Sequence, residues 1–166
     1  MRDPVVTRIQ ERSKAFERAP HGINYCLLNE YLPGQGIMPH EDGAAYYPVV
    51  ATISLGGSVV LDVTEKKSES GDAAQVVKKW RVLQEPLSLL LTTGNAYTDT
   101  LHGIAEVKED IDLTSETVAN WNLLGDTSQI EANGGRNERT IRYSLTFRDV
   151  LKVSSIPSTI FGRPRG

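Results

Sequence analysis

Short runs of apolar residues, separated by turn residues, fill most of the chain after residue 22. Because β-branched and large apolar side chains pack well on a pleated surface, runs of this kind predict strands. Glycine-containing turns such as Gly56-Gly57 and Thr93-Gly94-Asn95 divide the runs. The predicted strands are Ile23 to Leu28, Val49 to Leu55, Ser58 to Val63, Gln75 to Leu83, Leu87 to Leu91 and Thr140 to Val150. Together they predict a mainly β fold of the sandwich or jelly-roll kind.

The first residues follow a helical pattern instead. Between Pro4 and Ala19, the apolar residues Val5, Ile9 and Phe16 are interleaved with arginine and lysine, and Pro20 ends the pattern. This spacing predicts one amphipathic helix ahead of the strands.

The length of 166 residues predicts a single domain over residues 1–166. Residues 1–22 form its helical lead-in. Residues 108–139 interrupt the strand pattern, and we predict that they form an exposed insertion loop with a short helix near Ser115 to Leu124.

Charge, cysteine content and hydropathy limit the partners and the cellular compartment that we expect for the protein. A net charge of -3 and a pI of about 5.6 argue against a surface that binds phosphate everywhere, although a local basic patch stays open. Cys26 is the single cysteine, so it forms no internal disulfide, and its apolar neighbours predict a buried free thiol. No apolar run reaches the roughly 20 residues that span a bilayer, and no signal-peptide core follows Met1. We therefore expect a cytoplasmic or nuclear protein without a membrane segment.

A candidate metal site begins with His40 and Asp42, which stand two positions apart and share one face if the backbone is extended. His102 opens a later apolar segment. Two imidazoles and one carboxylate can occupy one face of an octahedral ion and leave three positions open, as in non-haem iron(II) oxygenases. His-x-Asp alone is a weak signal, because two polar residues in a loop are more often solvated.

The last predicted strand carries two arginines on one face. Alternation places Arg142 and Arg148 there with Ser144 and Thr146 between them. Buried together, the two guanidinium groups would repel each other and need an anion, and a dicarboxylic acid would supply it. An edge strand with two solvated arginines is the alternative. Upstream, Asn29 and Tyr31 share a face and could donate hydrogen bonds to a carboxylate, or simply end a strand.

Taken in order, these pieces resemble a known family. Asn-x-Tyr from residue 29, His-x-Asp from residue 40, a distal histidine and Arg-x-Ser-x-Thr-x-Arg from residue 142 are similar to the signature of AlkB-type dioxygenases. The local sequences of Gly36 to Gly43 and of Leu101 to Ile104 resemble those of the eukaryotic AlkB homologue six subgroup. The likeness extends from about residue 23 to residue 153 and implies a double-stranded β-helix, the jelly roll of these enzymes.

The resemblance also implies roles for the residues of the motifs. It implies iron(II) ligation by His40, Asp42 and His102. Arg142 and Tyr31 would hold the distal carboxylate of 2-oxoglutarate, while Asn29 and Arg148 would lie near its iron-bound end. Ser144, a further cosubstrate contact, departs from the asparagine common in the wider family.

The implied reaction uses O2 to convert 2-oxoglutarate to succinate and carbon dioxide while a substrate C–H bond is hydroxylated. A hydroxylated N-methyl group would then leave as formaldehyde. The partner expected from the family is single-stranded or flipped-base nucleic acid. We also expect the enzyme to be a monomer. The family's nucleotide-gripping lid generally precedes the Asn-x-Tyr segment, and with 28 residues ahead of Asn29 we expect it to be absent or truncated.

Several residues are candidates for gripping the substrate. Tyr46 and Tyr47 could stack on a base, although packing in the core is the more common fate of a tyrosine. Lys78, Lys79 and Arg81 could follow a phosphate backbone or lie on a solvated strand face. Two alternatives to nucleic acid demethylation remain open at this point. One is the same oxygenase chemistry on a protein or small molecule, and the other is a jelly-roll module that binds metal without turnover.

Overall fold

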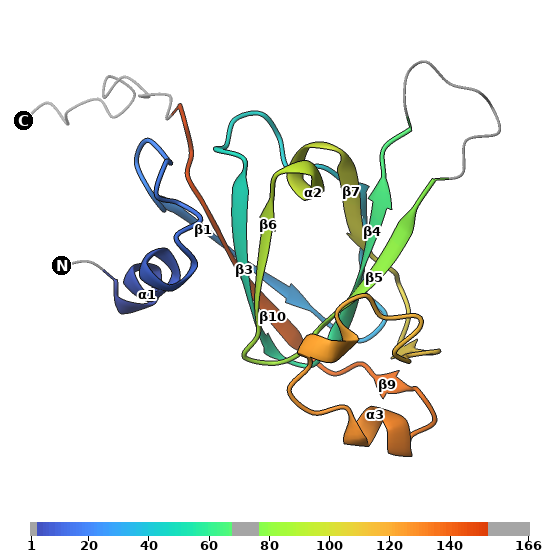
Figure 1. Cartoon of the computed structure of the whole chain (residues 1–166). Helices are drawn as coiled ribbons and strands as arrows, with labels where there is room; N and C mark the ends of the chain where they lie inside the picture. Colours follow the sequence, from blue (N-terminus) through green and yellow to red (C-terminus); the bar gives the residue numbers. More distant parts are fainter. Residues whose placement is uncertain (1–2, 68–76, 153–166) are drawn as a thin grey trace, which may run out of the picture.

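Two four-stranded antiparallel sheets face each other in the computed structural model, which describes residues 3–67 and 77–152 (Figure 1). The first sheet has the order β1-β10-β3-β6, with the bounds Tyr25–Tyr31, Arg142–Arg148, Val49–Gly56 and Leu89–Thr93. The second sheet has the order β2-β7-β4-β5, with the bounds Ile37–His40, Thr100–Ile104, Val59–Glu65 and Lys79–Gln84. This arrangement confirms the mainly β double-stranded β-helix with an N-terminal helix.

Two short strands of the second sheet have no counterpart among the predicted strands. β2 and β7 pair with each other, and β7 also pairs with β4. Each is short, and their sequences contain Pro39 and Gly103, which weaken a strand signal. The start of the predicted strand at Gln75 lies outside the described residues. Helix α2 (Asn95–Thr98) connects β6 to β7 at one end of the sandwich (Figure 1).

Helix α1 (Pro4–Ser13) is shorter than the sequence pattern predicts. The Asp3 side chain caps its first turn by accepting hydrogen bonds from the backbone N–H groups of Val5 and Val6, at 2.8 and 3.2 Å. Lys14 adopts a left-handed conformation with φ of 54°, and its N–H donates to the Gln10 carbonyl. This left-handed residue ends the helix six residues before the predicted proline stop, because Lys14 tolerates the C-cap conformation that glycine usually supplies.

The outer face of the first sheet carries one of the hydrophobic cores. Ile9 of α1 and Phe16 after it pack there, against Ala51 of β3 and Phe147 of β10. On β10 the side chains alternate, with Phe147 on this face and the arginines on the inner face. Cys26 lies on the outer face of β1 but is exposed, so the predicted burial of its thiol was wrong. β1 is an edge strand, and α1 leaves this position uncovered.

The insertion at residues 108–139 is a folded unit rather than an exposed loop. Leu113 and Val118 are buried against Val60 of β4 and Leu83 of β5. The predicted short helix is reduced to the 3-10 turn η1, and a separate helix follows it. The elements of the insertion are β8 (Glu109–Asp110), η1 (Trp121–Leu123), α3 (Ser128–Ala132) and β9 (Asn137–Glu138).

Polar contacts fasten this insertion to the sandwich. The buried guanidinium of Arg139 donates to both carboxylate oxygens of buried Asp110, at 3.0 and 2.6 Å, and to the carbonyl of Ala105. Along β5, the Asn120 side chain accepts from the Leu83 N–H at 2.9 Å and donates to the Leu83 carbonyl at 2.8 Å. Asn120 therefore satisfies the edge of β5 in the way that a neighbouring strand would.

A buried carboxylate ties the N-terminal segment to the end of β10. Asp149 is fully buried, and it accepts from the backbone N–H of His21 at 3.0 Å and the side-chain amide of Asn24 at 3.0 Å. The His21 ring nitrogen Nδ1 lies 2.9 Å from the same carboxylate. The sequence pattern marks His21 as a surface residue, and half of its side chain is indeed exposed, but its buried partner was not foreseen.

Replacing Asp149 with alanine should destabilise the fold by about 2 to 4 kcal/mol, because the variant leaves the His21 N–H and the Asn24 amide without their buried acceptor. Urea denaturation of both proteins at neutral pH measures this difference. The matched control is Asp126→Ala, whose exposed carboxylate accepts a local hydrogen bond from the Ser128 N–H, so its unfolding midpoint should stay close to that of wild type. Equal unfolding midpoints for wild type and Asp149→Ala would contradict the assignment.

Within the described ranges, no helix has the length and apolar character needed to cross a membrane.

Candidate active site

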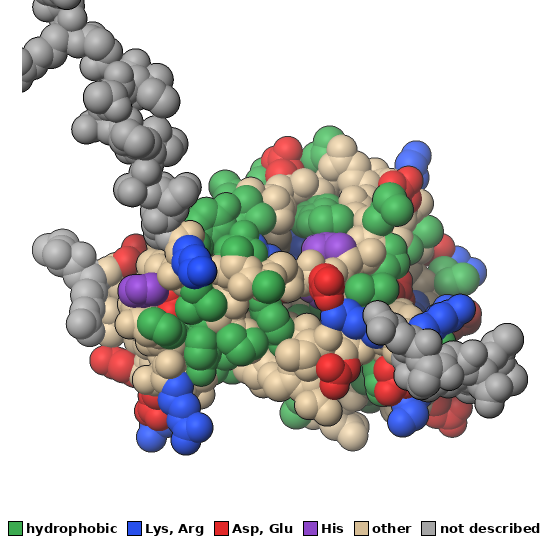
Figure 2. Space-filling view, turned by 90° about the horizontal axis from the view of Figure 1, so that it is seen from above, with side chains coloured by type: hydrophobic (Ala, Val, Ile, Leu, Met, Phe, Trp, Pro, Cys, Tyr) green, Lys and Arg blue, Asp and Glu red, His purple; other side chains and the backbone are tan. Residues whose placement is uncertain are grey.

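A cavity of about 190 Å³ lies between the two sheets, and its walls come from the inner faces of strands far apart in the sequence. Figure 2 shows the end of the molecule that carries α2, where histidine atoms are visible in a hollow among apolar and uncharged groups. Every site residue singled out in the sequence lines the cavity: Asn29, Tyr31, His40, Asp42, His102, Arg142, Ser144 and Arg148.

The two histidines are neighbours across the β2–β7 pair. His40 and His102 are register partners, and their ring centroids lie 4.4 Å apart with planes inclined by 55°. Nδ1 of His40 lies 2.9 Å from the Met38 carbonyl, to which it can only donate. The hydrogen bond therefore places the proton of a neutral ring on Nδ1 and leaves Nε2 with a lone pair for a ligand.

Asp42 follows β2 in a loop and turns its carboxylate toward both His102 and Arg148. Its Oδ2 lies 3.7 Å from Nε2 of His102, and its Oδ1 accepts a hydrogen bond from Arg148. Burial lowers the pKa of His102, although the nearby Asp42 carboxylate opposes this effect, so the neutral ring is favoured. In residues 3–67 and 77–152 no three side chains already form a complete set of metal ligands, and Asp42 is instead paired with Arg148.

Arg142 is a buried cation whose described contacts are all to neutral groups. Only 3% of the residue is exposed. Its Nε donates to the Ser54 hydroxyl at 2.8 Å, its Nη2 donates to the Gln84 side-chain oxygen, and its guanidinium lies 5.4 Å from the centre of the Tyr31 ring. Burial lowers the pKa of Arg142, which reports the cost of keeping this charge away from water. Such a charge would be stabilised by an anion in the cavity.

Arg148 lies at the other end of the same strand face and has an unused donor. Its Nη2 pairs with Asp42, and its guanidinium lies 4.9 Å from the centre of the Tyr46 ring. The Nε atom is buried and has no hydrogen-bond partner among the described residues. Because an unsatisfied buried donor costs free energy, this N–H is suited to a ligand oxygen.

The donor set fits iron(II) and 2-oxoglutarate. Two imidazoles and a carboxylate line the same cavity, and these are the ligand types of a facial iron(II) site, although the three groups do not form a complete ligand set in the described residues. A dicarboxylate matches two buried guanidinium groups at opposite ends of one strand, and guanidinium and carboxylate groups form charge-assisted hydrogen bonds. The free Nε of Arg148 is the observation that most directly calls for a ligand.

Sequence reasoning missed Ser54, Gln84 and the direct contact of Tyr46 with Arg148. Ser54 and Gln84 are buried polar residues at inward-facing strand positions, and together they orient Arg142. The signal available for Ser54 was its register partner Ser144. Gln84 had none, because it comes from the opposite sheet and nothing in its local pattern relates it to β10.

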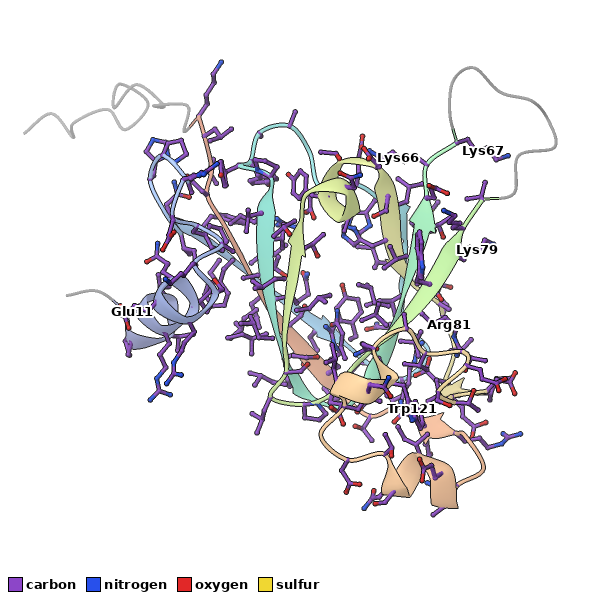
Figure 3. All side chains as sticks on the ribbon, viewed as in Figure 1. Glu11, Lys66, Lys67, Lys79, Arg81 and Trp121 are labelled. Atoms are coloured by element: carbon purple, nitrogen blue, oxygen red, sulfur yellow. The ribbon has the colours of Figure 1, made fainter. Side chains whose placement is uncertain are left out.

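The other substrate-gripping candidates lie away from the cavity. Tyr47 packs in the core beside α1. Arg81 donates to the backbone carbonyls of Ile111 and Asp112, at 2.7 and 3.0 Å, and so anchors the insertion. Lys79 and Arg81 lie on β5 (Figure 3), and Lys78 directly precedes this strand. On the face seen in Figure 2, the cationic side chains stand in separate groups.

Comparison with known proteins identifies the class. The family model of the 2OG-Fe(II) oxygenase superfamily matches residues 1–148. The chain belongs to this superfamily. It is similar to "Probable RNA/DNA demethylase ALKBH6" of Danio rerio, with 39% identity over 134 residues, which is 78% of this chain and 54% of that protein. These findings confirm the AlkB-type likeness of the motifs.

Two further comparisons agree. The chain is 30% identical over 131 residues to "tRNA (carboxymethyluridine(34)-5-O)-methyltransferase alkbh8" of Xenopus tropicalis, covering 78% of this chain and 19% of that protein. The solved structure of OsALKBH1 matches with a TM-score of 0.50 and 21% identity, covering 87% of this chain and 62% of that one, which shows the shared fold. The chain spans about half the length of its ALKBH6 relative.

Proposed function

We propose that the chain is an iron(II)- and 2-oxoglutarate-dependent dioxygenase that oxidatively demethylates alkylated RNA or DNA. The observation that carries the proposal is the cavity itself, in which two histidines and a carboxylate face two buried arginines, one of them with an unpaired Nε. Membership of the oxygenase superfamily supports the chemistry. The name of the Danio rerio relative supports the substrate class.

His40, Asp42 and His102 are proposed to hold iron(II). The Met38 carbonyl fixes the tautomer of His40, and burial lowers the pKa of His102 and so favours its neutral form, which leaves ring nitrogens that can bind a cation. When bound, the metal and its cosubstrate supply the oxidising chemistry, in which O2 converts 2-oxoglutarate to succinate and carbon dioxide and oxidises a substrate C–H bond. The Asp42 carboxylate, which pairs with Arg148 in this structure, would bind the metal as well.

The remaining residues are proposed to orient 2-oxoglutarate. Arg142, held by Ser54 and Gln84, would bind the distal carboxylate with help from Tyr31, whose ring lies beside the guanidinium. Arg148 and Asn29 would lie at the iron-bound end. Ser144 lies on the inner face of β10 between the arginines, and its short side chain leaves room for the chain of the acid. The walls of the cavity exclude bulk water from these charges, which strengthens their interactions.

A second candidate is the same oxygenase chemistry on a protein or a small molecule. The net charge of -3 and the scattered cations of Figure 2 favour it over a strongly basic nucleic acid surface. In either case we propose a monomer in the cytoplasm or nucleus. A single free cysteine supports a reducing compartment, and the covered edge of β5 supports the monomer.

Incubation of the full chain with iron(II), 2-oxoglutarate, ascorbate and air should release succinate, and N-methylated oligonucleotides should yield formaldehyde in equal amount. Unmethylated oligonucleotides of the same sequence are the control, because they offer no N-methyl group to oxidise. Succinate release without formaldehyde from any oligonucleotide would favour the second candidate. If the chain neither releases succinate nor binds 2-oxoglutarate, the proposal of an enzyme is refuted. The remaining alternative is then a jelly-roll module that binds metal without turnover.

A further inference from the structure

We propose that Tyr46 is a positioning residue for the reaction: its ring holds the Arg148 guanidinium in the orientation that receives the iron-bound end of 2-oxoglutarate. The inference rests on the proposed function. The key juxtaposition is an arginine fixed on two sides, by the Asp42 carboxylate along one edge and by the Tyr46 ring, 4.9 Å from the guanidinium carbon.

Tyr46 is tied to the strand that carries Arg148. It forms an isolated antiparallel bridge with Val150, two residues beyond Arg148. The flanking backbone repeats this pairing: the Tyr47 N–H donates to the Asp149 carbonyl at 2.9 Å, and the Leu151 N–H donates to the Ala45 carbonyl at 3.0 Å. The loop after Asp42 and the continuation of β10 are thus joined as a short ladder, which fixes where the Tyr46 ring sits.

A second aromatic ring supports the first. Tyr25 of β1 is the register partner of Arg148, and its ring centroid lies 6.4 Å from that of Tyr46 with a tilt of 31°. Aromatic rings at this separation attract each other. Tyr46 therefore has Tyr25 as a neighbouring ring as well as the Arg148 guanidinium.

This arrangement explains why Arg148 can keep an unpaired donor. A flexible arginine would rotate Nε toward water or a nearby carbonyl. Here Asp42 occupies Nη2 and Tyr46 lies over the guanidinium, so Nε stays buried and unpaired in the described structure. A cation–π contact of this kind stabilises the guanidinium without using any of its hydrogen-bond donors. Its N–H groups consequently remain available for a ligand carboxylate.

The test is equilibrium binding of 2-oxoglutarate to the iron(II)-loaded full chain, measured by calorimetry without oxygen. Tyr46→Leu should weaken binding about five- to tenfold, as the loss of a partly desolvated cation–π contact predicts. Tyr46→Phe keeps the ring and should bind within about twofold of wild type. Tyr47→Leu is the matched control: it removes the adjacent tyrosine from the core beside α1, so it should lower the melting temperature and leave 2-oxoglutarate affinity unchanged. If Tyr46→Leu does not fold, Tyr46→Met carries the same expectation.

A double-mutant cycle separates positioning from general damage. Tyr46→Leu combined with Arg148→Lys should weaken binding less than the product of the single effects, whereas combination with Arg142→Lys should be multiplicative. In steady-state succinate release, KM for 2-oxoglutarate should rise while kcat changes less than twofold.

Wild-type affinity in a folded Tyr46→Leu protein would overturn the inference and leave the proposed function standing. Equal losses in the Leu and Phe variants would also overturn it, since the hydroxyl would then be responsible. Absence of 2-oxoglutarate binding by the wild type would refute both proposals.

Discussion

His40→Ala should lower the affinity for iron(II) by more than about 100-fold and abolish succinate release. Loss of groups that merely orient a metal ligand already costs about 10- to 100-fold, and His40 is proposed to be a ligand itself, oriented by the Met38 carbonyl. Anaerobic titration with iron(II) and 2-oxoglutarate, followed by the visible absorption of the complex, measures the change.

The adjacent residue provides the control for this variant. Glu41 is exposed and pairs with Lys66 rather than facing the cavity, so Glu41→Gln should bind iron(II) as the wild type does. A His40→Ala protein that retains wild-type iron(II) affinity would contradict the ligand assignment, whatever its activity.

Arg142→Met should weaken 2-oxoglutarate binding by about 30-fold or more, because removing one member of a buried charge pair costs about 2 to 5 kcal/mol. Iron(II) binding in the absence of 2-oxoglutarate should be unaffected. Stability should stay within about 1 kcal/mol of wild type: the Ser54 and Gln84 bonds are lost, but a buried cation without a carboxylate partner is removed as well. Calorimetry and urea denaturation measure the two quantities.

A surface arginine serves as the matched variant. Arg136 is exposed and pairs with Glu109 at 2.6 Å, so Arg136→Met should alter neither binding nor stability appreciably. Unchanged 2-oxoglutarate affinity in the Arg142→Met protein would show that the distal carboxylate, if it binds, finds another partner.

The sequence predicted the fold class and most strands because β-branched runs and glycine turns are local signals. The inward face of β10 was also predictable, since the alternation of Arg142, Ser144, Thr146 and Arg148 depends only on strand geometry. Helix α1 was predicted too long, because nothing local distinguishes Lys14 from its neighbours as a left-handed stop.

The candidate site was predictable only as a set of residues. The spatial meeting of His40 and His102 depends on the pairing of two strands too short to be recognised from the sequence. The network around Arg142 depends on Gln84 in the opposite sheet. All eight predicted residues lie on the cavity wall. The ordered signature that identified them carried no information on these supporting contacts.

The way Asn120 completes the edge of β5 constrains how the insertion can vary. An open strand edge recruits other chains, so a shortened variant lacking residues 113–124 would present both an unpaired ladder and the apolar side chains of Val60 and Leu83. Length can change more freely around α3, where every side chain except the partly buried Ile130 is exposed. A replacement segment of different sequence should therefore still carry a polar side chain that pairs with the backbone of Leu83, as Asn120 does here.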